Sequence, residues 1–147
     1  MTPPYLLATV WLVAPLVAFG VPLTFFARGT LGPDTLVSAM RELGALFVPY
    51  VGVVLAFVYQ ARRTRRATRP AAGVSRAAAA VAVVTSLVWN LVVILSLMQA
   101  AVGALPFETA LQTASELAGS LSWAVAPALG YFFGGNSRSE TPTRKTA

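Results

Sequence analysis

The stretch YLLATVWLVAPLVAFGVPLTFF, residues 5–26, decides the fold of this chain. Its 22 residues carry no charged side chain. A helix rises 1.5 Å per residue, so a run of this length crosses the hydrocarbon core of a bilayer, which is about 30 Å thick. The run predicts a membrane-spanning helix over residues 4–26. A cleaved signal peptide is disfavoured, because no Lys or Arg precedes the run and because the run is too long for one.

Three further uncharged runs follow, over residues 43–60, 77–103 and 117–135. Each is long enough for a helical crossing or close to it. We therefore expect an all-α integral membrane protein with one four-helix transmembrane domain over residues 1–135, built as two antiparallel helical hairpins. The predicted spans are residues 4–26, 40–60, 77–102 and 110–134.

The composition favours the same class and excludes several others. Hydrophobic residues make up 56% of the chain and charged residues 11%, whereas a soluble domain carries about 25% charged residues. The chain has no Cys and no His. Disulfides are therefore excluded, and the usual ligands of zinc, haem and iron–sulfur clusters are missing. We expect no catalytic residues, no metal and no cofactor.

Basic residues predict the orientation. Of the 11 Lys and Arg residues, all but Arg28 and Arg41 lie in the segment 61–76 or in the tail 136–147. The positive-inside rule places such segments in the cytoplasm. We expect a multi-pass protein of the cytoplasmic (inner) membrane with both termini, the arginine-rich loop 61–76 and a disordered tail 136–147 on the cytoplasmic side. The loop's arginines are Arg62, Arg63, Arg65, Arg66, Arg69 and Arg76.

Three interpretations of the arginine cluster are open. The cluster suffices as a determinant of topology. It also suits contacts with anionic lipid headgroups, at about 1 kcal/mol per basic residue near the surface. A nucleic-acid contact is disfavoured, because the loop has no aromatic residue for base stacking and no folded platform beside it.

Small residues recur every fourth position along the last run. Helices in lipid associate through close packing, which rows of small residues allow. Two interpretations are open: packing against a shorter small-residue strip at residues 78–90 within the chain, or a seam between subunits. The row comprises Ala110, Ala114, Ala118, Ser122, Ala126, Gly130 and Gly134, and the seam would use its last five members.

Two polar residues within the predicted spans are candidates for a function. Burying a polar or ionisable group in a membrane span costs free energy unless the group is paired or hydrated. Glu116 is expected to form an ion pair with Arg41 or, alternatively, to line a pore. Asn90 is expected to form an interhelical hydrogen bond.

The second and fourth runs share a local pattern. Asp34-Thr35 lies eight residues before Glu42-Leu43, and Glu108-Thr109 lies eight residues before Glu116-Leu117. A duplicated helical hairpin would produce this repeat. Chance would also produce it, since acids are favoured in first helical turns.

The expected function is that of an oligomeric channel, a pore or a holin-like membrane effector. The alternatives are an accessory or assembly subunit of a larger membrane complex and a small transporter. Four-helix multidrug exporters are disfavoured, because they need an acid in the first helix and residues 4–26 have none. The expected partners are a bilayer with anionic headgroups and either further copies of the chain or another membrane protein.

Overall fold

The computed structural model describes the backbone of residues 3–63 and 76–134, and the side chains of residues 6–56, 77 and 79–130. These residues form four helices: α1 (Pro3–Ala27), α2 (Pro33–Arg63), α3 (Arg76–Ala101) and α4 (Phe107–Gly134). No strand occurs within the described ranges. The predicted all-helical fold is confirmed.

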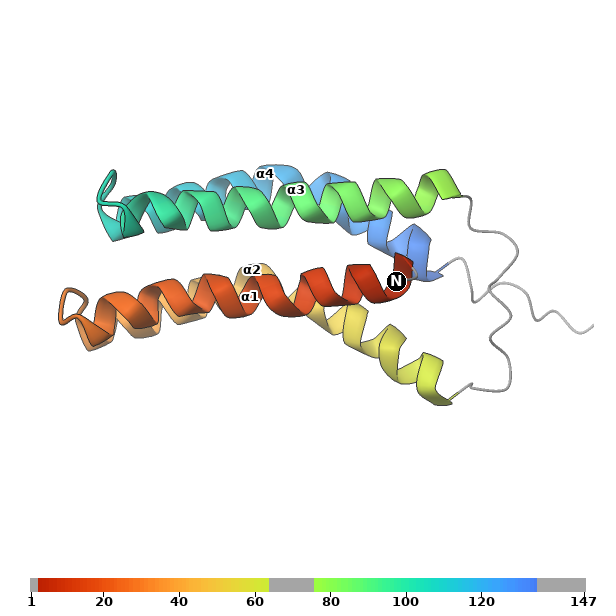
Figure 1. Cartoon of the computed structure of the whole chain (residues 1–147), viewed down its shortest axis with the longest axis horizontal. Coiled ribbons are helices and arrows are strands. Elements are labelled where there is room, and N and C mark those ends of the chain that lie inside the picture. The colour runs from red at the N-terminus through yellow and green to blue at the C-terminus, as the bar shows by residue number, and fades with distance from the viewer. Residues whose placement is uncertain (1–2, 64–75, 135–147) are drawn as a thin grey trace, which may run out of the picture.

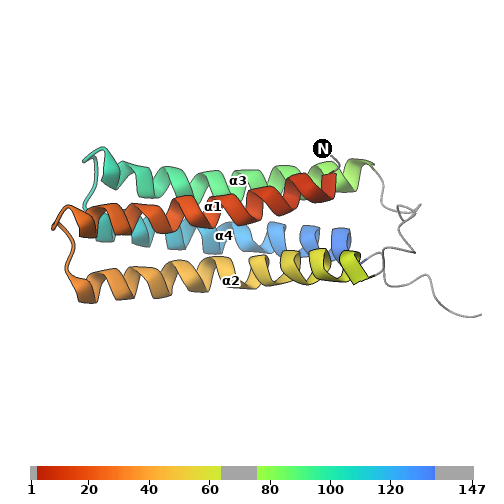
Figure 2. The ribbon, with the colours of Figure 1, turned by 60° about the horizontal axis from the view of Figure 1, so that its bottom comes forward.

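The four helices lie side by side as one bundle (Figures 1 and 2). Contacts between the described residues join α1 to α2, α1 to α3, α3 to α4 and α2 to α4. The order around the bundle is therefore α1, α2, α4, α3. The most extensive contact is between α3 and α4, and the smallest is between α2 and α4. The side formed by α2 and α4 is thus the least tightly closed.

Two short connections, residues 28–32 and 102–106, lie at the same end of the bundle, here called the loop end (Figure 1). α1 and α3 end there in the same way. Gly29 and Gly103 adopt positive φ angles of 70° and 76°. The amide of Thr30 donates to the carbonyl of Phe25 at 3.1 Å, and the amide of Ala104 donates to that of Gln99 at 2.8 Å. Both caps are therefore of the Schellman type.

The helices that leave the loop end begin with residues suited to that position. Pro33 is the first residue of α2 and Pro106 directly precedes α4, where a missing amide proton costs nothing. Asp34 and Glu108 then occupy the first turns, where a carboxylate is favoured by the helix dipole. α2 bends beyond its midpoint (Figure 1), where Pro49 interrupts the backbone hydrogen bonding.

The centre of the bundle is an aromatic cluster of Trp11, Phe47, Tyr50 and Trp89. Trp11 and Trp89 are fully buried, and their ring centroids lie 5.3 Å apart. The Trp11 indole donates to Ser86 Oγ at 3.0 Å. The Trp89 indole donates to the carbonyl of Ala118 at 2.9 Å. This cluster links all four helices, because its rings come from α1, α2 and α3 and its last acceptor from α4.

Three of the helices are long and apolar enough to cross a membrane, over Leu6–Ala27, Pro33–Ala56 and Ala79–Ala101. The described part of α4 is not among them, because polar groups such as Glu108, Gln112 and Glu116 interrupt its apolar residues. The predicted membrane class is thus supported by three helices.

Candidate functional site

α4 has one row of small residues that faces the core. Ala110, Ala114 and Ala118 are fully buried. The hydrogen bond from Trp89 to the Ala118 carbonyl requires close approach between α3 and α4, which a methyl side chain permits. The first half of the predicted row therefore packs within the chain.

The second half of the row does not stay in the core. Four residues are more than the 3.6 residues of one helical turn, so each step of the row advances about 40° around the helix. Ser122 is half-buried, and Ala126 and Gly130 are exposed. The side chain of Gly134 lies outside the described residues. The part of the row that we predicted as a subunit seam thus starts buried at Ala118 and ends on the outer surface.

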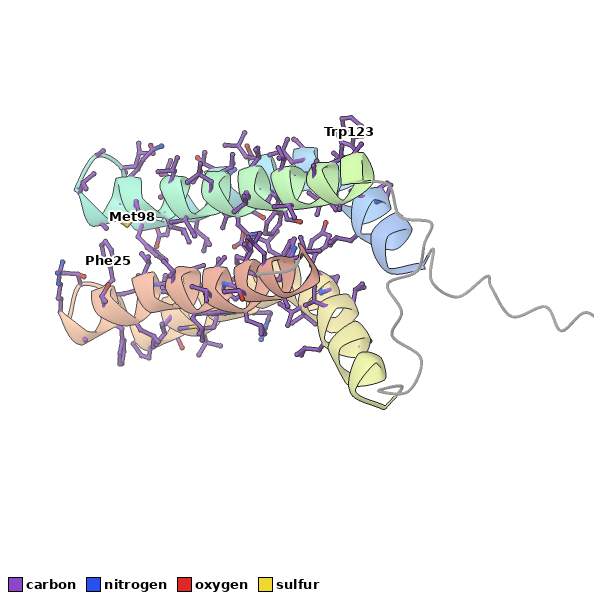
Figure 3. The ribbon with its side chains drawn as sticks, turned by 45° about the vertical axis from the view of Figure 1, so that its right-hand side comes forward. Phe25, Met98 and Trp123 are labelled. Carbon is purple, nitrogen blue, oxygen red and sulfur yellow. The ribbon has the colours of Figure 1, made fainter. Side chains whose placement is uncertain are left out.

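The outer surface of α4 is polar toward the loop end. We call the exposed residues Thr109, Gln112, Glu116, Gly119, Ser120 and Trp123 the outward face of α4. The amide of Gln112 donates to the Glu116 carboxylate at 2.9 Å, and Ser120 Oγ donates to the Glu116 carbonyl at 2.9 Å. Trp123 ends this face, is 77% exposed and projects away from the bundle (Figure 3).

α1 and α3 present a different surface. Their exposed side chains over the same length are mainly aliphatic, including Leu16 on α1 and Val84 and Leu95 on α3. Met98 continues this apolar surface on α3 toward the loop end, whereas Phe25 is half-buried and packs against Phe107 of α4 (Figure 3). The bundle is therefore asymmetric: the α1–α3 side suits lipid, and the outward face of α4 does not.

Arg41 lies on the exposed side of α2. No ion pair joins it to Glu116 within the part of the chain that the structure describes, and the Glu116 carboxylate accepts its bond from Gln112 instead. The predicted Arg41–Glu116 pair is thus absent within one chain.

Asn90 is 3% exposed and lies beside the aromatic cluster. Its amide donates to the carbonyl of Ser86, on its own helix, at 2.7 Å. Its Oδ1 atom is buried and has no hydrogen-bond partner among the described residues. The expected interhelical bond is therefore not formed there. Asn90 also lines an open groove of about 320 Å³ between α1 and α3, whose other walls are aliphatic apart from Thr9.

The remaining predicted site residues have side chains outside the part of the chain that the structure describes. Of the arginine cluster, Arg65, Arg66 and Arg69 fall in the segment 64–75, and the side chains of Arg62, Arg63 and Arg76 are not described either. Within the described residues, no group of acidic, His or Cys side chains could hold a metal ion.

Comparison with known families, curated proteins and solved structures finds no match to this chain.

The aromatic cluster is the feature that the sequence analysis missed. Trp in membrane proteins is enriched at the lipid–water interface. Trp89 instead lies near the middle of its uncharged run and Trp11 about a third of the way along its own, and such positions indicate burial beside a hydrogen-bond acceptor.

Proposed function

We propose that this chain is a four-span protein of the cytoplasmic membrane that works as an oligomeric channel or pore. The two helical hairpins, α1–α2 and α3–α4, cross the bilayer with both termini and the arginine-rich loop in the cytoplasm. The 28 residues of α4 are long enough for a fourth crossing.

The outward face of α4 carries the proposal. Gln112, Glu116 and Ser120 are exposed on a bundle whose α1–α3 side is aliphatic. In a bilayer these groups need water or another protein beside them, because the one bond that Gln112 donates to the Glu116 carboxylate does not offset the cost of exposing that charge to hydrocarbon. Subunits arranged with these faces toward one another would enclose a hydrated path. Glu116 would make that path selective for cations, as acidic side chains do in cation channels.

The test is ion flux through the full chain in vesicles of phosphatidylethanolamine and phosphatidylglycerol. We expect potassium flux that depends on the amount of inserted protein. Glu116→Gln should lower cation flux several-fold, because it removes the charge on the pathway. Glu108→Gln is the matched control, since Glu108 is exposed in the first turn of α4 and should leave flux unchanged.

Absence of flux from correctly inserted protein would overturn the proposed channel function. It would favour the alternative of an accessory subunit of a larger membrane complex. Equal loss of flux in the two variants would remove Glu116 from the pathway.

A further inference from the structure

Arg41 on α2 and Glu116 on α4 are opposite charges exposed on neighbouring helices. Arg41 is the ninth residue of α2 and Glu116 the tenth of α4, and both helices start at the loop end. At 1.5 Å per residue the two side chains therefore leave their helices at levels that agree to about 1.5 Å. Both lie about 12–14 Å from that end, at a depth where an unpaired charge is costly in a bilayer.

We propose that a second copy of this chain packs on the α2–α4 side about a two-fold axis along the helices, so that Arg41 of each copy pairs with Glu116 of the other. This proposal rests on the membrane placement in the proposed function and not on conduction. It replaces the hydrated Glu116 of a cation path with a Glu116 that is paired to Arg41, so the charge-reversal experiment and the flux experiment decide between the two roles.

Symmetry makes the two charges meet. α2 and α4 lie next to each other, and both run away from the loop end (Figures 1 and 2). A two-fold rotation about an axis parallel to the helices exchanges left and right, so α2 of one copy lies opposite α4 of the other. An interface of this kind is self-complementary, and each contact occurs twice. One dimer would thus contain two Arg41–Glu116 pairs at the same depth.

Farther from the loop end, small residues on α2 and α4 lie at the same distance from the starts of their helices. Counted from the start of each helix, Ala45 has the same level as Gly119, and Gly52 the same level as Ala126. All four are exposed. An added Cβ at Gly52 or Gly119 would meet nothing within 4 Å in this chain, so neither glycine is needed for packing inside the bundle. Small residues on both partners allow the close backbone approach by which membrane helices associate.

The opposite side of the bundle does not offer these features. The exposed residues of α1 and α3 are mainly large and aliphatic, and such a surface is satisfied by lipid. The complementary charges therefore select the α2–α4 side, and they select a second copy because one chain supplies both partners.

The decisive experiment uses two charge reversals on separate, differently tagged copies. Arg41→Glu alone places Glu opposite Glu twice in a homodimer, and Glu116→Arg alone places Arg opposite Arg twice. Each variant expressed alone should dimerise more than about tenfold more weakly, because like charges then face each other at two places in the homodimer. Expressed together, they should form the heterodimer, in which both pairs are opposite in charge. An ion pair within one chain cannot produce this rescue. Glu108→Arg is the control and should leave the dimer intact.

Cross-linking tests the same interface without altering a charge. The chain has no Cys, so Ala45→Cys and Gly119→Cys can be placed on separate copies. They should form a disulfide between copies in native membranes. Leu91→Cys, exposed on α3, should form none with either.

A heterodimer no more abundant than the homodimers would overturn the proposal. So would the absence of the Ala45–Gly119 disulfide, or a monomeric wild-type chain in lipid nanodiscs. A dimer with no ion flux would instead overturn only the channel.

Discussion

At the scale of single residues, the stability of this bundle depends on the acceptors that its buried hydrogen-bond donors find. The Trp11 indole is fully buried and donates to Ser86 Oγ on α3. If that oxygen were absent, the N–H would have neither a partner nor water beside it. A buried donor without an acceptor costs about 1–3 kcal/mol. Interhelical hydrogen bonds measured inside membranes average about 0.6 kcal/mol, because the unfolded chain also finds partners there.

Ser86→Ala should therefore lower the free energy of unfolding by about 1 kcal/mol, between these two estimates. Thr85→Ala is the matched control. Thr85 is half-buried, and its hydroxyl bonds only to carbonyls of its own helix, at 2.8 and 3.3 Å. Unfolding in mixed micelles, followed by tryptophan fluorescence, measures both. Equal destabilisation by the two changes would show that the Trp11–Ser86 bond contributes nothing.

At the scale of elements, the caps at the loop end reinforce the internal repeat. Gly29 and Gly103 are 74 residues apart, as are the acids Asp34 and Glu108 in the first turns that follow. Both glycines have positive φ and are followed by the same hydrogen bond. The cap glycines and the first-turn acids thus repeat with the same separation. This agreement supports duplication of a helical hairpin more strongly than the acids alone.

Gly103→Ala should destabilise the protein by about 1 kcal/mol, because an L-residue is strained at positive φ. A Cβ there would meet nothing within 4 Å, so the loss would report backbone strain alone. Gly20→Ala is the control within α1, where a Cβ also meets nothing. It should be neutral or stabilising by up to about 1 kcal/mol. Thermal unfolding in detergent compares the two, and a loss at Gly20 as large as at Gly103 would contradict this account.

The sequence predicted the helices better than it predicted their faces. Uncharged runs locate α1 and α3 because charge is expensive in a bilayer. They do not reveal that Trp11 is buried and its neighbour Leu12 exposed, because core and lipid are both apolar and impose no contrast on the sequence. The faces of α4 could be distinguished only in part. Its small-residue row was visible, but the point at which the row leaves the core depends on the packing of α3.

At the scale of the whole molecule, the bundle has two unlike sides. The α1–α3 side is aliphatic, and the side with α2 and α4 carries Arg41, Glu116 and exposed small residues. Glu116 lies nearer the loop end than the other end of α4, so the proposed orientation decides which side of the membrane is closer to this carboxylate.

The positive-inside rule predicts that the loop end faces away from the cytoplasm, because its two connections contain Arg28 as their one basic residue. Thr30→Cys and Ala104→Cys should therefore react with a membrane-impermeant maleimide added outside intact cells. Ser75→Cys and Ser139→Cys should react only after the membrane is opened. Replacing Arg62, Arg63, Arg65 and Arg66 together with Gln should lower labelling at Thr30→Cys, since the bias that retains the loop in the cytoplasm is weakened. External labelling at Ser139→Cys in the otherwise unchanged chain would mean that the bundle is inserted the other way round, with Glu116 toward the cytoplasm.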